Sequence, residues 1–232
     1  LAAKNAAKNN FKTLLIDEKN KLGGATIYQN KEFNKINNQS SSDWIKKEIN
    51  ELKNINNLEI KTRTSVAAYH GYNYLLAREN LTDHLENKDK NNKVRQRLLK
   101  IRAKKVILAT GALERPLVFN NNDRPGIMLS TAVKKYADFF GVKCGVKNVF
   151  FTNNDSAYES ALCLYNKGIK VDAIIDIRNN SNSKIVKAVE QIGIQIYWSH
   201  TVVDTNGYRR LNNISIMKLS NDGMTVTGDR IN

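Results

Sequence analysis

The feature that most constrains the fold is a short apolar run that ends in very small residues. Residues 106–108 (VIL) lead directly into Ala109, Thr110 and Gly111. Brief continuous apolar runs are typical of buried parallel strands, and small residues at a strand end let another group approach the backbone closely. Because ligands of open α/β sheets collect at the carboxyl ends of strands, the segment predicts a strand that delivers the chain to a dinucleotide. An ordinary buried strand followed by a turn explains these residues equally well.

The region before this run alternates helix-like and strand-like patterns. Residues 1–10 predict a helix with a small-residue face, and residues 11–17 predict a buried strand. An amphipathic pattern predicts a further helix over residues 43–54, with Ser42 as its N-cap. A helix followed by a strand is the second part of a βαβ unit. We therefore expect the first strand and its Gly-rich turn to precede Leu1.

Residues 58–103 have a different character, with short strand-like runs at residues 58–62, 65–70, 73–77 and 98–103. Residues 87–93 are strongly polar and predict a solvated hairpin loop. These patterns predict a small antiparallel β-meander at about 58–103 within the first module.

The alternation restarts in the second half of the chain. The predicted helices cover residues 130–140, 156–167 (opened by a capping box, Ser156 to Glu159) and 184–192. The predicted strands cover residues 148–152, 171–177, 194–198, 211–219 and 224–227. The sequence therefore predicts an α/β fold with two Rossmann-like βαβ modules of the FAD/NAD(P)-binding type. The first covers residues 1–140 and contains the meander, and the second covers residues 141–232 and is truncated at its C-terminus.

Asp17 is the first candidate ligand-binding residue, because it ends the second strand of the first module. An acid at this place in a dinucleotide fold hydrogen-bonds the ribose hydroxyls of the adenosine half. Glu18 follows it, and Lys19 is expected over the adenine or near a phosphate. Gly23 and Gly24 either turn backbone amides toward the pyrophosphate or form a simple turn. A solvated charge at a strand end explains Asp17 alone, but the small residues after residue 108 favour the dinucleotide.

The second module lacks a standard phosphate-binding turn. Where a G-x-G-x-x-G/A motif is expected, Thr152 and Asn154 replace the first two glycines, and only Ala157 fits its place. Asp155 adds a negative charge, whose repulsion of a phosphate at about 4 Å is worth about a few kcal/mol at an intermediate dielectric. Our hypothesis is that this module keeps the fold but binds a nicotinamide cofactor poorly or not at all. Asp176 stands at the ribose-acid position of this module, which proves little by itself.

Composition excludes several classes of function. The net charge is +15, but the lysines are scattered and no compact basic block occurs, so we expect no nucleic-acid partner. No run approaches the length of about 18 apolar residues that a membrane span needs. The two cysteines, Cys144 and Cys163, form no close pair, which indicates a reducing compartment and a cytoplasmic location. The start has neither a Met nor an apolar core segment, so we expect no signal peptide and a piece of a longer protein.

No catalytic or metal-binding constellation is expected in this chain. The three histidines are isolated, at His70, His84 and His200. No H-E-x-x-H, paired Cys/His spacing or C-x-x-C motif occurs. Arg115 is a weaker candidate, which either pairs with a phosphate or forms an ion pair with Glu114 or Asp123.

Three blocks of the sequence, DEKNKLGG, VILATGALERPLVFNNNDRPGIM and VFFTNNDSAYESALCLYNKGIKVDAIID, resemble the alpha subunit of heterotetrameric sarcosine oxidase. The resemblance covers nearly the whole chain, and the ERPLVF, NNDRPGIM and FTNNDSAY blocks are specific to that family. It implies an FAD-like module that holds NAD and is interrupted by an NAD-like module. It also implies a beta subunit with FAD, where substrate is oxidised, and an FMN at the alpha–beta boundary, where oxygen is reduced.

The resemblance further implies which residues and partners are involved. The cofactor-binding residues would be Asp17, Glu18, Lys19, Gly24, Ala25, Val66, Thr110 and Gly111, with no catalytic residue and no metal. With beta, gamma and delta subunits, the complex would convert sarcosine to glycine, hydrogen peroxide and formaldehyde or 5,10-methylenetetrahydrofolate. Sarcosine and tetrahydrofolate would bind elsewhere in the complex, and the NAD in this chain would be structural.

Three other readings compete with this one. A stand-alone NAD(P)H-dependent oxidoreductase would carry FAD in the first module and NADH in the second, which residues 152–157 disfavour. A subunit of a related amino-acid or opine dehydrogenase would differ only in its partner subunit. A basic RNA-interacting domain would leave Asp17 and the small residues at 109–111 without a role.

Overall fold

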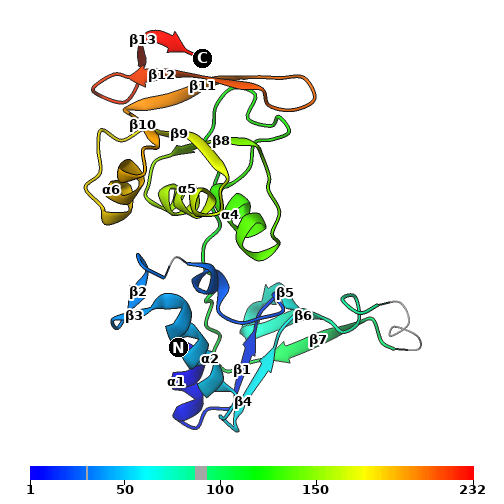
Figure 1. Ribbon diagram of the computed structural model, residues 1–232. Helices are drawn as coiled ribbons and strands as arrows, with labels where there is room; N and C mark the ends of the chain where they lie inside the picture. The colour runs from blue at the N-terminus through cyan, green and yellow to red at the C-terminus, as the bar shows by residue number, and fades with distance from the viewer. Residues whose placement is uncertain (30, 87–92) are drawn as a thin grey trace. The chain divides into compact units, whose positions relative to one another are not determined.

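The computed structural model describes residues 1–29, 31–86 and 93–232. It divides into two compact units, Leu1–Ala112 and Leu113–Asn232 (Figure 1). These units are defined by their internal contacts, whereas the two modules expected at 1–140 and 141–232 are defined by dinucleotide-binding patterns. The boundary between the modules stays a prediction. Among the described residues, no helix is both long enough and apolar enough to cross a membrane.

The first unit begins with the predicted helix and strand. Its first elements are α1 (Ala2–Lys8), β1 (Thr13–Ile16), α2 (Ser41–Leu52) and β4 (Leu58–Lys61). Strands β1 and β4 are parallel, with Thr13 opposite Leu58. Ion pairs from Lys4 to Glu48 (2.8 Å) and Glu51 (2.6 Å) connect α1 to α2. The parallel pairing of strands that are separated by a helix confirms the βα pattern predicted for this region.

The N-cap of α2 was predicted two residues too late, at Ser42 and not at Ser40. Ser40 precedes the helix, and its Oγ accepts a hydrogen bond from the amide of Asp43 at 3.2 Å. Ser42 lies inside the helix and is buried. Several serines in a row offer the same capping chemistry, so the sequence pattern alone does not choose between them.

Short elements between β1 and α2 were not predicted. They are the 3₁₀ helix η1 (Gly24–Tyr28) and a hairpin of β2 (Lys35–Ile36) and β3 (Gln39–Ser40). The hairpin turns at Asn37 and Asn38, whose φ angles are +50° and +60°. Asparagine tolerates this left-handed conformation, which two-residue hairpin turns require.

The expected meander is confirmed. It contains β5 (Thr64–His70), the 3₁₀ helix η2 (Gly71–Asn73), β6 (Tyr74–Asn80) and β7 (Gln96–Arg102). The three strands form an antiparallel sheet in the order β5-β6-β7. The polar hairpin loop expected at 87–93 falls almost entirely outside the described residues.

The prediction of a strand at residues 106–108 is wrong. In the described part of the chain, residues 103–119 adopt neither helix nor strand. Ile107 and Leu108 are 67% and 69% exposed, and within the described residues β1 pairs with β4 alone. An apolar run supplies the propensity for a strand, but a buried parallel strand also needs hydrogen-bonding neighbours and cover on both faces.

The second unit contains a parallel sheet and its helices. The elements are α4 (Ser130–Phe139), β8 (Lys147–Thr152), α5 (Ser156–Asn166), β9 (Lys170–Asp176), α6 (Lys184–Gln191) and β10 (Gln195–Trp198). The sheet order is β10-β9-β8, as expected for consecutive βαβ crossovers. Ile174, Val186 and Val189 are fully buried in its core. Each predicted helix and strand of this sheet is confirmed to within a few residues.

An antiparallel sheet packs on the other face of the parallel sheet. It contains β11 (His200–Asn206), β12 (Asn213–Leu219) and β13 (Val226–Ile231) in that order. Figure 1 shows helices on one face of the parallel sheet and this antiparallel sheet on the other. A buried cluster of Ile175, Val202 and Ile216 joins the two sheets. The hairpin of β12 and β13 was predicted, whereas β11 was missed.

Candidate functional site

Asp17 lies at the carboxyl end of β1, as the sequence predicts. Its backbone is fixed on both sides, because its amide donates to the carbonyl of Lys61 (2.9 Å) and its carbonyl accepts from the amide of Thr64 (3.0 Å). The carboxylate oxygen Oδ1 accepts a hydrogen bond from the amide of Lys19 at 2.9 Å. This short turn holds the acid in place, and among the described residues no intramolecular donor bonds to its other oxygen. The arrangement suits an acceptor for sugar hydroxyls.

The start of the meander lies next to the residues that follow Asp17. The amide of Arg63 donates to the carbonyl of Lys19 at 2.8 Å. This bond brings the exposed side chains of Glu18 and Lys19 to the beginning of β5, on which Val66 is 45% exposed. The structure therefore brings four of the predicted site residues, Asp17, Glu18, Lys19 and Val66, to one region of the first unit.

The two glycines at 23 and 24 differ in their surroundings. A Cβ on Gly23 would lie 2.7 Å from Ile27 and 3.2 Å from Ile45, so this glycine permits η1 to pack on α2. Gly24 has φ +55°, and a Cβ there would meet nothing within 4 Å. Gly24 therefore has open space where a side chain would stand, and Ala25 beside it is exposed, so their part in binding a ligand stays a prediction.

Thr110 and Gly111 are exposed in the extended segment that follows the meander. Gly111 has φ +74°, which favours glycine. Among the described residues, no hydrogen bond connects this segment to Asp17. The convergence of Thr110 and Gly111 with Asp17 at one dinucleotide stays a prediction.

Glu114 has a structural partner in the second unit. Its carboxylate accepts hydrogen bonds from the amides of Ser130 (3.1 Å) and Thr131 (2.9 Å) and from both hydroxyls. It thereby caps α4, whose N-cap Leu129 has no side-chain acceptor. Burial opposes ionisation of Glu114, but the hydrogen bonds from Thr131 and Ser130 prevail and lower its pKa. The ion pair with Arg115 that the sequence suggested is therefore not the main interaction of this acid.

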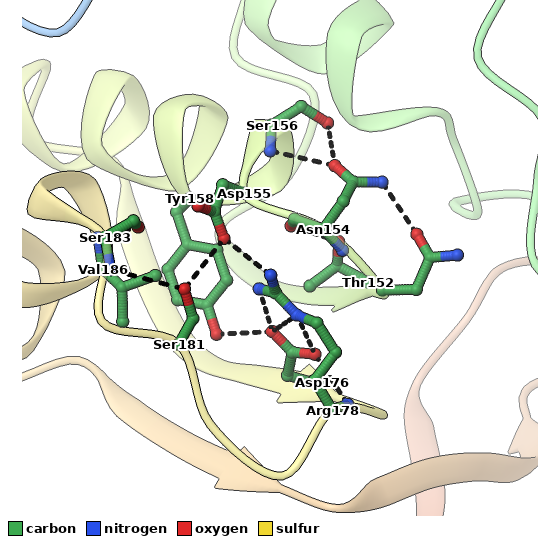
Figure 2. A network of polar contacts seen from close by, with 11 residues as sticks. Thr152, Asn154, Asp155, Ser156, Tyr158, Asp176, Arg178, Ser181, Ser183 and Val186 are labelled. Carbon is green, nitrogen blue, oxygen red and sulfur yellow. Dashed lines mark hydrogen bonds and ion pairs between the residues drawn. The ribbon is translucent and has the colours of Figure 1, made fainter.

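The corresponding acid of the second unit is in a different state. Asp176 ends β9 and is fully buried. Its Oδ1 accepts from the amide (2.9 Å) and Nε (3.0 Å) of Arg178, and its Oδ2 accepts from the hydroxyl of Tyr158 (2.8 Å) and a terminal nitrogen of Arg178 (2.7 Å). Burial and the bond to Asp176 raise the pKa of Tyr158, so this phenol stays protonated. Figure 2 shows the acid enclosed by these partners.

Arg178 also reaches the start of α5. Its guanidinium lies 2.8 Å from Asp155, the N-cap residue of the helix. The hydrogen bond to Asp176, followed by the one to Asp155, raises the pKa of Arg178. Burial opposes ionisation of Asp155, but bonds from Ser183 and Arg178 lower its pKa. Arg178 is a functional candidate that the sequence analysis missed, although its spacing two residues after a strand-ending acid was a usable signal.

Two backbone amides at the start of α5 donate to side chains of the same turn. The predicted capping box is wrong, because Ser156 is already helical and its amide donates to the side-chain oxygen of Asn154 at 2.9 Å. The amide of Asn154 in turn donates to the hydroxyl of Thr152 at 3.1 Å. Figure 2 shows these side chains folded over the turn where a Rossmann fold presents its amides.

Cys163 and His200 take part in local hydrogen bonds. Among the described residues, no group of three or more His, Cys, Asp or Glu has the arrangement of a metal site. Burial, followed by a hydrogen bond with Asp138, raises the pKa of Cys163 to about 12, so this thiol stays protonated near neutral pH. The imidazole of His200 hydrogen-bonds the carbonyl of Trp198 at 2.6 Å.

Comparisons with known proteins agree with the fold and with the resemblance in the sequence. The search against family models found no match. The sarcosine oxidase subunit alpha of Corynebacterium sp. strain P-1 is 36% identical over 223 residues, covering 95% of this chain and 23% of that protein. The subunit alpha of Rhizobium meliloti strain 1021 is 34% identical over 177 residues, covering 76% of this chain and 18% of that protein.

Solved structures share the fold at low sequence identity. L-proline dehydrogenase from P. horikoshii matches with a TM-score of 0.62 at 22% identity, over 91% of this chain and 35% of that chain. Thioredoxin reductase from T. acidophilum matches with a TM-score of 0.64 at 16% identity, over 99% of this chain and 69% of that chain. At these identities the likeness concerns the fold alone.

The chain shares its α/β fold with the solved L-proline dehydrogenase and thioredoxin reductase, in agreement with the fold class that the sequence predicted. Over the part of those proteins that it spans, the chain is homologous to the alpha subunit of sarcosine oxidase. The resemblance seen in the sequence is therefore confirmed, for a chain that spans about a fifth of the length of these relatives.

Proposed function

We propose that the first unit holds NAD within a sarcosine oxidase alpha subunit. The observation that carries this proposal is the state of Asp17, a strand-ending acid with a fixed backbone and an available carboxylate oxygen. The proposed cofactor-binding residues are the predicted ones: Asp17, Glu18, Lys19, Gly24, Ala25, Val66, Thr110 and Gly111. The homology to named alpha subunits supports this assignment over other dinucleotide proteins.

The proposed contacts follow from the chemistry of each group. The carboxylate of Asp17 accepts hydrogen bonds from the two ribose hydroxyls of the adenosine half. Lys19 places a positive charge beside the adenine and its phosphates, and the backbone of Val66 lies along the adenine. Gly24, Thr110 and Gly111 expose backbone next to the pyrophosphate, where side chains would obstruct it.

In the complete enzyme this part of the chain binds cofactor and acts as scaffold. In many enzymes NAD transfers hydride. Here we propose a structural role for it, because no acid–base or nucleophilic group is expected beside it. The oxidation of sarcosine to glycine, with hydrogen peroxide and formaldehyde or 5,10-methylenetetrahydrofolate, would take place on FAD and FMN with the beta, gamma and delta subunits. We propose a cytoplasmic complex with neither a nucleic-acid nor a membrane partner.

The test uses the full-length gene product purified with its co-expressed neighbours. The protein should release about one NAD per alpha chain on acid denaturation, and the complex should produce hydrogen peroxide from sarcosine. The variant Asp17→Ala should purify with little or no NAD. A fully occupied Asp17→Ala variant would contradict the assignment of the site, and a complex that is inactive on sarcosine would contradict the assignment of the substrate.

A second candidate is a stand-alone NAD(P)H-dependent FAD oxidoreductase. The solved structures with this fold include proteins named as reductases and as an NADPH oxidase, which supports this alternative at the level of the fold. Such an enzyme would need nicotinamide cofactor in the second module. Reduction of a dye by NADH in the absence of any partner subunit would favour this candidate.

A further inference from the structure

The carboxyl edge of the parallel sheet in the second unit has the position of a dinucleotide site but different occupants. In a Rossmann fold, the pyrophosphate lies at the N-terminus of the first helix, and the acid that ends the second strand binds a ribose. Here those two places are the start of α5 and Asp176. Each place is filled by side chains of the chain itself.

At the ribose position, donors from the protein itself occupy the carboxylate of Asp176. An ionised carboxylate has about four acceptor sites on its two oxygens. Asp176 is fully buried and receives donors from the amide, Nε and a terminal nitrogen of Arg178 and from the hydroxyl of Tyr158. No acceptor site of Asp176 is left for a pair of sugar hydroxyls.

The pyrophosphate position is filled as well. The amides of Asn154 and Ser156 donate to side chains within their own turn, at 3.1 and 2.9 Å. The carboxylate of Asp155 stands at the N-terminus of α5 and is paired with Arg178 at 2.8 Å. A phosphate arriving here would find the amides of Asn154 and Ser156 already bonded and would meet the like charge of Asp155. The guanidinium that balances this charge is already shared by two carboxylates.

We infer that the second βαβ module is closed to nucleotides by its own side chains, among which Arg178 links the ribose position to the phosphate position. Its guanidinium bridges the end of β9 and the start of α5, so that it ties together the two elements between which a dinucleotide would bind. The protein then takes one dinucleotide per chain, in the first unit. This count rests on the proposed function, whereas the closure of the second module does not.

The test measures nucleotide stoichiometry and location together. The full-length gene product, stripped of endogenous nucleotide, is dialysed to equilibrium against labelled NAD and, separately, ADP. Trp198 is a local reporter, because it stacks on Tyr158 with ring centroids 6.2 Å apart. A signal from Trp198 is assigned by its disappearance in Trp198→Phe.

The expected result is one NAD per chain, lost in Asp17→Ala, with no change in the fluorescence of Trp198. Two NAD per chain, of which one survives Asp17→Ala and alters Trp198, would overturn the inference and leave the proposed function intact. A single NAD that survives Asp17→Ala and alters Trp198 would overturn both. Absence of binding would agree with a closed second module and overturn the proposed function.

Arg178→Lys keeps a positive charge with fewer donors and serves as the variant that is expected to fold. It should leave the stoichiometry at one NAD per chain, since Asp155 and Asn154 still occupy the phosphate position. Binding of a second NAD to the wild-type protein, or of an NAD that competes with the Arg178 contacts and alters Trp198, would contradict the closure.

Discussion

The ends of β1 and β9 each carry an aspartate at the same place in a βαβ unit, but the two carboxylates differ in how many hydrogen bonds they accept within the protein. Asp17 accepts one hydrogen bond from its own turn, whereas Asp176 is fully buried and accepts hydrogen bonds from four donor groups of Arg178 and Tyr158. An acid at the ribose position is therefore not evidence of a nucleotide site by itself. The state of its oxygens decides whether the acid recognises a ligand or holds the protein together.

The largest expected effect is on the stability of the second unit. Arg178→Met would leave Asp176 buried without its main partner, which typically costs about 3–5 kcal/mol. Denaturant unfolding followed by the fluorescence of Trp198 measures this loss. The double variant Asp176→Asn/Arg178→Met should lose less than the single variant, because no buried charge is left uncompensated.

The matched control for that variant is Arg230→Met, which removes an Arg–Asp pair of similar length (2.9 Å to Asp204) on the surface. Exposed pairs contribute little, so its effect should be far smaller. Equal losses from Arg178→Met and Arg230→Met would show that the network around Asp176 has no special structural role.

The second effect concerns ligand binding in the first unit. Asp17→Ala should weaken NAD binding by about 10- to 100-fold, because charge-assisted hydrogen bonds are worth about 1.5–3 kcal/mol. Isothermal titration of the full-length gene product measures the change. Glu59→Ala removes an exposed acid of the neighbouring strand and should leave affinity within about twofold, as expected for a surface change of less than about 0.5 kcal/mol.

The third effect tests the cap of α4. Glu114→Ala should destabilise the second unit by about 1–2 kcal/mol, in the range of a lost helix cap. Glu114→Gln retains an acceptor oxygen and should lose less. Thermal unfolding compares the two with the exposed Glu190→Ala as control. A neutral Glu114→Ala variant would contradict the capping role.

The smallest effect is a pH dependence at Asp204. Bonds from Arg230, Thr205 and Asn121 lower its pKa from 3.8 to about 2. Because the folded state binds fewer protons than the unfolded state in this window, the contribution is present above pH 3.8 and lost as the pH falls toward 2. The difference in unfolding midpoint between wild type and Asp204→Asn should therefore shrink between pH 5 and pH 3. A difference that is constant over this range would contradict the lowered pKa.

Much of the fold could be predicted, because it depends on local periodicity. The β8–β10 sheet and its helices follow from apolar runs and helical periodicity, and the meander follows from short strand-like runs between polar turns. The run at residues 106–108 failed because a parallel strand depends on neighbours that the pattern does not specify. β11 was missed because its polar residues give no continuous apolar run.

The candidate site could be predicted only in part. Asp17 directly follows an apolar run that predicts a strand, so the sequence was enough to identify it and its neighbours as candidates. The state of Asp176 depends on Tyr158 from α5 and on Arg178, which the fold brings to one carboxylate. Arg178 lies close in sequence, but the hydrogen bond from Tyr158, 18 residues before Asp176, is not contained in the spacing of any one segment.

A crystal structure of the full-length protein soaked with NAD would show which of the two acids binds the nucleotide. We predict that the adenosine ribose hydroxyls lie about 2.6–3.2 Å from the carboxylate of Asp17, the usual hydrogen-bond range, with Arg178 still bound to Asp176. Nucleotide lying between β9 and α5, or an adenosine half that does not contact Asp17, would contradict it.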